Sequence, residues 1–202
     1  MSKVTIQGDA SGTGIFTIAS PNSNTDRTLV LPDEAGTVLT SAGVPASAMP
    51  AGSVIQVVQS LLTTTFSTTS SSFVDTGLSL SITPSSASNK ILIQWSIPNS
   101  HSNTTASNGF NLVRDGSNIA QGTGGSINLT SANDSGGSSH MGVNALVFLD
   151  SPSTTSAITY KVQIKRQAGG TGYINRSSSL NAGSDVYQAG SISTLIAMEV
   201  AE

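Results

Sequence analysis

The sequence predicts an all-β protein whose main part is an antiparallel β-sandwich. Short segments with alternating apolar and polar residues recur along the chain. The clearest spans residues 90–97, where Ile91, Ile93, Trp95 and Ile97 share one face of an extended chain. Turn-forming Gly, Pro, Asn and Asp residues separate these segments, and no long segment has the apolar spacing of a helix.

The composition narrows the class of protein. Only 9% of the residues are charged, the net charge is −3, and no basic block is present, so we expect no nucleic-acid partner. Without cysteine, stability must come from the core or from partner subunits. The chain begins without a signal-like segment, and no apolar run approaches the length of a membrane span, so we expect cytoplasmic folding and no membrane insertion.

Three regions are expected along the chain. Residues 1–40 contain short strand candidates separated by turns, a β-meander too small to bury a core alone. Residues 41–52 are small residues with Pro45 and Pro50, which is typical of an extended linker. Residues 53–202 form the head domain.

Part of the first region resembles a known module. Residues 12–22 read GTGIFTIASPN, and residues 27–38 read RTLVLPDEAGTV. They resemble a short module of virion proteins of tailed bacteriophages, found in tail-fibre-like proteins. The resemblance covers only this part of the chain and carries no catalytic residue. It implies a protein on the virion surface, assembled in the host bacterial cytoplasm and docked on another virion protein through residues 1–40.

The head domain has strand signals at the spacing of a sandwich. They fall at residues 53–59, 73–75, 78–82, 90–97, 110–114, 117–121, 143–149, 157–165, 173–176 and 192–200. Asp115-Gly116 predicts a two-residue hairpin turn, because both turn positions need positive φ. Strand 90–97 is expected to end at Pro98, and Trp95 to be a core anchor, with a sugar-stacking platform as the alternative.

This succession of strands, closing on a long C-terminal one, is typical of a jelly roll. It is similar to the trimeric heads of the tumour-necrosis-factor and complement globular-head type, which implies a homotrimer. An immunoglobulin-like sandwich is the alternative fold.

Motifs for catalysis are missing from the sequence. The glycine clusters match neither a phosphate loop nor a dinucleotide fingerprint, and no serine-nucleophile elbow is present. His101 and His140 lie in polar segments, and the scattered acidic residues suggest neither a calcium loop nor a glycosidase pair. We expect no enzyme, cofactor or metal site, although an ion on a symmetry axis stays open.

Surface recognition is the remaining role. The polar segments 99–108, 122–142 and 167–190 are expected to be exposed loops rich in hydrogen-bonding residues. The last of them supplies candidate receptor contacts that could stack on a sugar and bond its hydroxyl groups: Tyr173, Asn175, Arg176 and Tyr187. The alternative is that both tyrosines pack beneath the loop.

Two strands are apolar on both faces. Residues 192–200 and 143–149 both lack the clean alternation of a half-buried strand. A single sandwich covers one face of each, so self-association is expected to cover the other. The interface candidates are Leu195, Ile196, Met198, Val147 and Leu149.

Together these features predict a non-enzymatic bacteriophage virion surface protein. It would be a trimeric fibre or spike that displays its head for binding a glycan or protein on the host or another surface. A capsid decoration protein, as a cement or head fibre, is the near-equal alternative, because the first region is short. A virion-associated polysaccharide depolymerase and a cellular lectin are the remaining alternatives.

Overall fold

The computed structural model describes residues 11–13, 15, 24–26, 28, 44–103, 105–125, 129–134, 140–179 and 190–202. The chain divides into two compact units, Met1–Val38 and Leu39–Glu202. The predicted meander lies almost entirely outside the described residues. The second unit, here called the head, contains every strand found among the described residues.

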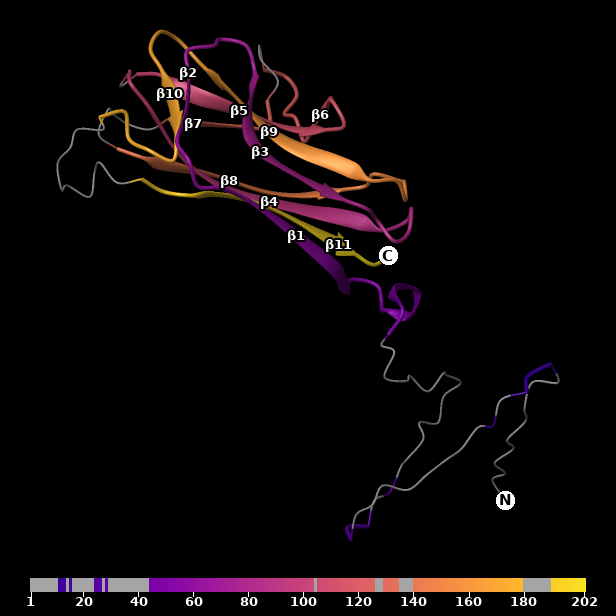
Figure 1. Cartoon of the computed structure of the whole chain (residues 1–202). Coiled ribbons are helices and arrows are strands. Elements are labelled where there is room, and N and C mark those ends of the chain that lie inside the picture. Colours follow the sequence, from indigo (N-terminus) through magenta and orange to yellow (C-terminus); the bar gives the residue numbers. More distant parts are fainter. Residues whose placement is uncertain are drawn as a thin grey trace. The chain divides into compact units, whose positions relative to one another are not determined.

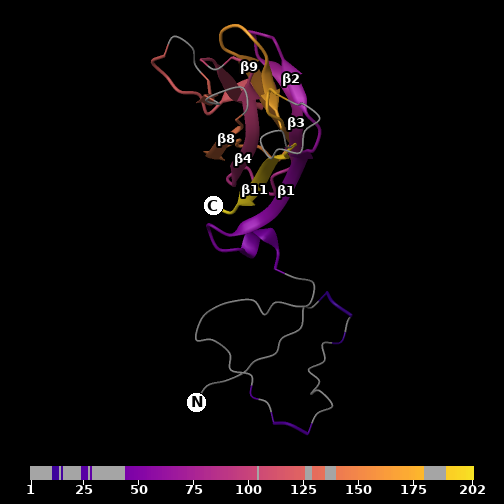
Figure 2. The ribbon, with the colours of Figure 1, turned by 90° about the vertical axis from the view of Figure 1, so that its left-hand side faces the viewer.

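The head is an all-β structure of two antiparallel sheets, with the first sheet strongly curled (Figures 1 and 2). The first, sheet A, runs in the order β1-β11-β4-β10-β2, and β8 pairs with the other edge of β4. The second, sheet B, runs β3-β9-β5-β6, with β7 also on β5. The strands are β1 (Val54–Leu62), β2 (Phe66–Thr68), β3 (Val74–Ile82), β4 (Lys90–His101), β5 (Ser107–Arg114), β6 (Ser117–Ile119), β7 (Ser131–Asp134), β8 (Gly142–Asp150), β9 (Ile158–Arg166), β10 (Gly172–Ile174) and β11 (Ser193–Val200).

The core lies between the two sheets and follows the alternating pattern of the sequence. The inward side chains of β4 are buried together with alternate residues of β3, β5, β9 and β11. Trp95 is 3% exposed, and its Nε1 donates a 2.8 Å hydrogen bond to Oδ1 of Asn144 on β8. The prediction of Trp95 as a core anchor is therefore confirmed, and its indole ring is not available as a sugar platform.

The expected end of the fourth strand at Pro98 is wrong. Strand β4 continues to His101, and Pro98 pairs with Val143 of β8. On its other edge, β11 pairs only as far as Ser96 and β10 begins at Asn99. The Pro98 carbonyl accepts from the Asn175 N–H on this edge, where the neighbouring strand changes. The N–H group that proline lacks would fall at this junction between β11 and β10. The sheet therefore loses few inter-strand hydrogen bonds at Pro98.

Local turn chemistry agrees with the sequence at the β5–β6 hairpin. Asp115 and Gly116 have φ values of 47° and 87°, and Arg114 pairs with Ser117 across the turn. Strands β2 and β7 and a short 3₁₀ turn at Ala46–Ala48 were not expected. Within the described residues, no helix has the length and apolarity needed to cross a membrane.

The long strand β4 defines the two ends of the head. Its first residue, Lys90, pairs with Val200. This end of the head lies beside the linker, since Gly52 N donates a 2.8 Å hydrogen bond to Ala201 O. Its last residue, His101, pairs with Gly172 of β10. A strand of this length spans roughly 35–40 Å. We call these the linker end and the tip.

Candidate functional site

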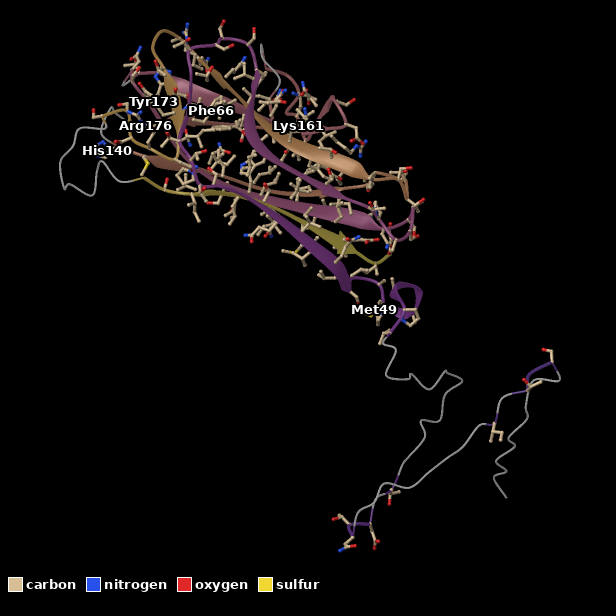
Figure 3. All side chains as sticks on the ribbon, viewed as in Figure 1. Met49, Phe66, His140, Lys161, Tyr173 and Arg176 are labelled. Carbon is tan, nitrogen blue, oxygen red and sulfur yellow. The ribbon has the colours of Figure 1, made fainter. Side chains whose placement is uncertain are left out.

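Two of the predicted receptor contacts form a stacked pair at the tip. The Arg176 guanidinium lies over the Tyr173 ring, with its Cζ 4.6 Å from the ring centroid. Figure 3 shows both at the end of the head opposite Met49, with His140 at the same end. Both side chains are partly exposed. The guanidinium Nε donates to Ser177 O at 3.0 Å, and Nη2 donates to Ser178 O at 3.3 Å, so its plane is fixed by backbone carbonyls.

Asn175 lies between Tyr173 and Arg176 in the sequence, but its side chain points into the head. It is fully buried, and its Nδ2 donates to the carbonyl oxygens of Leu62 and Thr64 at 2.6 and 2.9 Å. Its Oδ1 accepts from Ser193 Oγ at 2.7 Å, and its φ is 61°, a left-handed conformation. The prediction of Asn175 as a receptor contact is therefore wrong for this fold. It turns the chain so that Tyr173 and Arg176 point outward. Tyr187 lies outside the described residues.

The segment 99–108, predicted as an exposed polar loop, is largely internal. Asn99, Ser100, His101 and Asn108 have no exposed surface and belong to strands β4 and β5. Asn108 Nδ2 donates to Asn99 Oδ1 at 3.1 Å and to Ser100 O at 2.8 Å. Sequence reasoning missed this because Asn and Ser are typical of exposed loops, whereas here hydrogen bonds between β4 and β5 place them inside the head.

These buried amides lie directly beneath the stacked pair. A Cβ atom on Gly172 would come within 2.3 Å of Asn108 Oδ1, so only glycine fits there. Strand β10, which pairs with β2 and β4, is thereby packed closely onto this buried polar layer at the tip. Tyr173 lies on β10, so this packing supports the stacked pair from the core side.

The outer face of sheet A carries the other candidate site. Val147 and Leu149 on β8 are 69% and 49% exposed, and Val57 and Leu61 on β1 are 58% and 51% exposed. Strand register places these residues in rows with outward residues of β4 and β11. The rows are Val57–Met198–Leu92–Leu149, Gln59–Ile196–Gln94–Val147 and Leu61–Thr194–Ser96–Ala145. We call these rows the apolar face, and none of their residues is charged.

The predicted interface residues divide between the two sides of sheet A. Ile196, Met198, Val147 and Leu149 lie on the apolar face. Leu195 is fully buried in the core, and its candidacy as an interface residue is therefore wrong. The sequence could not separate the two sides of β11, because Leu195 and Ile196 are equally apolar.

Sheet B presents a different outer surface. Ser81 and Thr159 are hydrogen bonded at 2.8 Å, and Asp75 accepts from Lys161 Nζ at 3.0 Å and from Gln163 at 2.7 Å. The hydrogen bonds from Gln163 and then Lys161 outweigh burial and hold the pKa of Asp75 below its usual value. This is the polar surface expected of a sheet that faces water.

A buried carboxylate occupies the linker end. Glu199 is fully buried and accepts hydrogen bonds of 2.5–2.7 Å from Gln56 Nε2, Asn89 Nδ2 and both N and Oγ of Ser85. Burial opposes ionisation, but these donors outweigh it, so the pKa of Glu199 lies below its usual value. The carboxylate joins β1, the β3–β4 connection and β11.

A second carboxylate, Asp150, is bound by Arg114 and Tyr160. Arg114 Nη1 lies 2.8 Å from both oxygens, and Tyr160 Oη donates to Oδ2 at 2.6 Å. Burial and this carboxylate raise the pKa of Tyr160. In the part of the chain that the structure describes, no three metal-ligating side chains cluster. His101 is buried, and its Nδ1 accepts from Asn103 N at 2.9 Å.

A cleft of about 260 Å³ lies at the linker end. This volume is below the range of about 300–1,000 Å³ usual for small-molecule sites. The cleft is lined by Ala46, Met49, Ser85, Ser86, Ser88, Asn89, Ala201 and Glu202. The hydroxyl of Ser85 donates to Glu199, those of Ser86 and Ser88 are hydrogen bonded to each other, and Glu202 pairs with Lys90.

Comparison with known proteins adds no assignment to these surfaces. No family model matches the sequence, and a search of curated proteins gives no match. The stacked pair and the apolar face therefore have to be interpreted from their own chemistry.

Proposed function

We propose that this protein is a non-enzymatic component of a bacteriophage virion surface. Residues 1–40 attach it to another virion protein, and the head is displayed as a homotrimer for binding. The virion assignment rests on the resemblance of residues 12–22 and 27–38. The display of a self-associating head rests on the apolar face of sheet A.

A jelly roll is the topology that we propose for the head. In a jelly roll, one long antiparallel hairpin folds over, so the first strand pairs with the last and each later pair nests inside. The pairs here are β1 with β11, β3 with β9, β4 with β8, and β5 with β7. These four nested pairs support a jelly roll over an immunoglobulin-like sandwich.

The apolar face is the observation that carries the self-association proposal. Monomeric proteins rarely expose a contiguous apolar surface of more than a few hundred Å². Each large apolar side chain moved fully from water into a contact contributes roughly 1.5–3 kcal/mol. Six such residues on β1 and β8 are between 48% and 69% exposed in the single chain: Val54, Val57, Leu61, Val143, Val147 and Leu149.

A second copy of the chain is the occupant that fits this face. The rows contain no charge, so two or three copies meet without like-charge repulsion. The polar outer surface of sheet B would stay in water. We choose threefold symmetry because of the likeness to trimeric jelly-roll heads. Burial of the apolar face requires a partner but does not set the number of copies.

The proposal is tested on virus particles that lack the protein. The full chain should rebind, whereas the head alone, residues 44–202, should not. Equal rebinding by the head would overturn the anchoring role of residues 1–40. The position of the rebound protein, on the tail or on the capsid, separates a fibre or spike from a decoration protein.

A further inference from the structure

We propose that the stacked Tyr173–Arg176 pair is a binding site for an acidic polysaccharide that carries carboxylate groups. The inference rests on the surface-binding role proposed above and names the ligand class for it. Three features of the pair support it: an unpaired cation, an oriented hydrogen-bonding edge, and a rigid support.

The charge of Arg176 is not matched within the described part of the head. Lys90, Arg114 and Lys161 form ion pairs with Glu202, Asp150 and Asp75. Arg176 forms none with any described residue and contacts only an aromatic ring and two backbone carbonyls. A partly exposed guanidinium held in this way keeps its full attraction for an anion.

The orientation of the guanidinium suits a carboxylate. Arginine has five N–H donors in a planar fork. Nε and Nη2 each donate to a carbonyl, and Nη1 makes no hydrogen bond with the described residues. Stacking on Tyr173 fixes the plane, so its donors are presented to a ligand at little entropic cost.

The surroundings of the pair favour a polysaccharide over other polyanions. Ser67 lies opposite Tyr173 on β2 and is exposed, and Ser178 and Ser179 follow Arg176. Neutral hydroxyl groups beside Arg176 match a sugar chain with spaced charges and many hydroxyls. Arg166, at the end of β9, donates to the carbonyl groups of Thr69 and Ala168. A nucleic acid would need several basic residues in one stripe, and the chain has only 8 Lys and Arg residues in all, without a basic block.

The buried layer below the pair gives the third support. Asn175, Asn108 and Asn99 are fully buried, and the Nδ2 atom of each donates hydrogen bonds to internal oxygens. Burial of an amide is unfavourable without such partners. Asn175 bonds the chain just after β10 to Leu62 O and Thr64 O, and Asn108 packs closely against Gly172 of β10. The two outward side chains therefore need little reorganisation to bind.

The experiment measures binding of the full-length protein to immobilised polygalacturonate, with neutral dextran as the reference polymer. We expect salt-sensitive binding to polygalacturonate and none to dextran. Arg176→Gln should weaken binding on the order of tenfold, the loss expected for one charge-assisted contact. The affinity of Arg176→Lys for polygalacturonate should lie between those of the unmodified protein and Arg176→Gln, because lysine keeps the charge without the planar fork of donors.

Lys90→Gln is the matched control, because it removes the same charge at the linker end. Its binding should stay within about twofold of the unmodified protein, a change too small for a lost direct contact. Equal losses in Lys90→Gln and Arg176→Gln would overturn the site, as would equal binding to dextran or no binding to polygalacturonate. The particle-rebinding experiment does not depend on Arg176, so its outcome is separate.

Discussion

The carboxylate of Glu199 on β11 accepts a 2.7 Å hydrogen bond from Nδ2 of Asn89, the residue just before β4. Glu199 has no exposed surface, and its donors on Gln56 and Ser85 are also uncharged. One ionised group thus joins three segments that are far apart in the sequence. It closes the linker end of the sandwich.

Replacing Glu199 with Gln should destabilise the head. The new amide group has one oxygen where two accepted hydrogen bonds, so at least one donor among Gln56, Ser85 and Asn89 loses its acceptor. We expect the free energy of unfolding to fall by about 1–3 kcal/mol at neutral pH. Urea unfolding at fixed protein concentration measures this change in the free energy of unfolding. Glu202→Gln is the control, because that exposed ion pair should contribute less than about 1 kcal/mol. Equal stability of Glu199→Gln and the unmodified protein would contradict the role of this carboxylate.

Low pH should remove the stabilisation that the ionised Glu199 carboxylate gives to the head. The pKa of Glu199 in the folded state lies below its ordinary value of 4.5. The stabilisation is therefore fully present above that value and is lost as the pH falls through the lower folded-state pKa. Between pH 6 and pH 3, the unmodified protein should lose more stability than Glu199→Gln. Parallel pH profiles would show that Glu199 is not responsible.

Substitutions at Asn175 should separate its backbone role from its hydrogen bonds. Both Asn175→Gly and Asn175→Ala remove the bonds to Leu62 O and Thr64 O, and each should cost about 1–3 kcal/mol. Ala should cost roughly 1 kcal/mol more, because a φ of 61° suits Gly but strains a residue with a Cβ. Thermal or urea unfolding gives both values. Equal stability of the two variants would argue against a conformational role.

Charge on the apolar face should dissociate the assembly without unfolding it. Light scattering at low micromolar concentration should give a multiple of the monomer mass for the unmodified protein. Val147→Asp should give the monomer mass and keep the β-sheet circular dichroism spectrum, because a charge cannot be buried unpaired. A monomeric mass for the unmodified protein would contradict the self-association proposal.

Two variants serve as controls for this experiment. Leu195→Asp places a charge in the core and should unfold the head rather than dissociate it. Ser79→Asp adds the same charge to the exposed outer side of sheet B and should leave the mass unchanged. Dissociation by Ser79→Asp would show that net charge, and not the apolar face, controls assembly.

We expect no hydrolysis of surface polysaccharides. The buried carboxylates Glu199 and Asp150 already accept hydrogen bonds from Gln56, Asn89, Ser85, Arg114 and Tyr160. Glycosidases need two carboxyl groups positioned on either side of the scissile bond. Reducing-end assays on acidic and neutral polysaccharides should stay at background. Release of oligosaccharides that a single carboxylate substitution abolishes would reverse this conclusion.

Most of the head strands could be predicted from the sequence, because their alternation has a period of two. Residues 78–82, 90–97 and 158–165 each have one apolar side, and all lie in strands whose apolar side is buried. The predicted strand 157–165 begins one residue later, at Ile158. The Asp115-Gly116 turn was predictable for a local reason, its need for positive φ. Strand β7 was not, because Ser131–Asp134 has no apolar alternation.

The candidate sites were only partly predictable. Tyr173 and Arg176 were identified by residue type, and the structure adds that they stack at the tip. Asn175 was misplaced on the surface because its partners, Leu62 and Thr64, are 113 and 111 residues away in the sequence. Asn99 and Asn108 were misplaced because their burial depends on how β4 and β5 pack, and their residue type does not reveal it. Leu195 was misplaced because both sides of β11 are apolar.

Local sequence patterns are enough to predict antiparallel strands, to locate most of them, and to identify those that are apolar on both sides. Side-chain alternation and turn conformations are local properties, so a single strand carries them. The side of β8 and β11 that faces the core, and the burial of Glu199 and Asn175, follow instead from the packing of the sheets. These choices depend on donors and packing partners from other strands. Burial of a polar group is favourable only when such partners are in place.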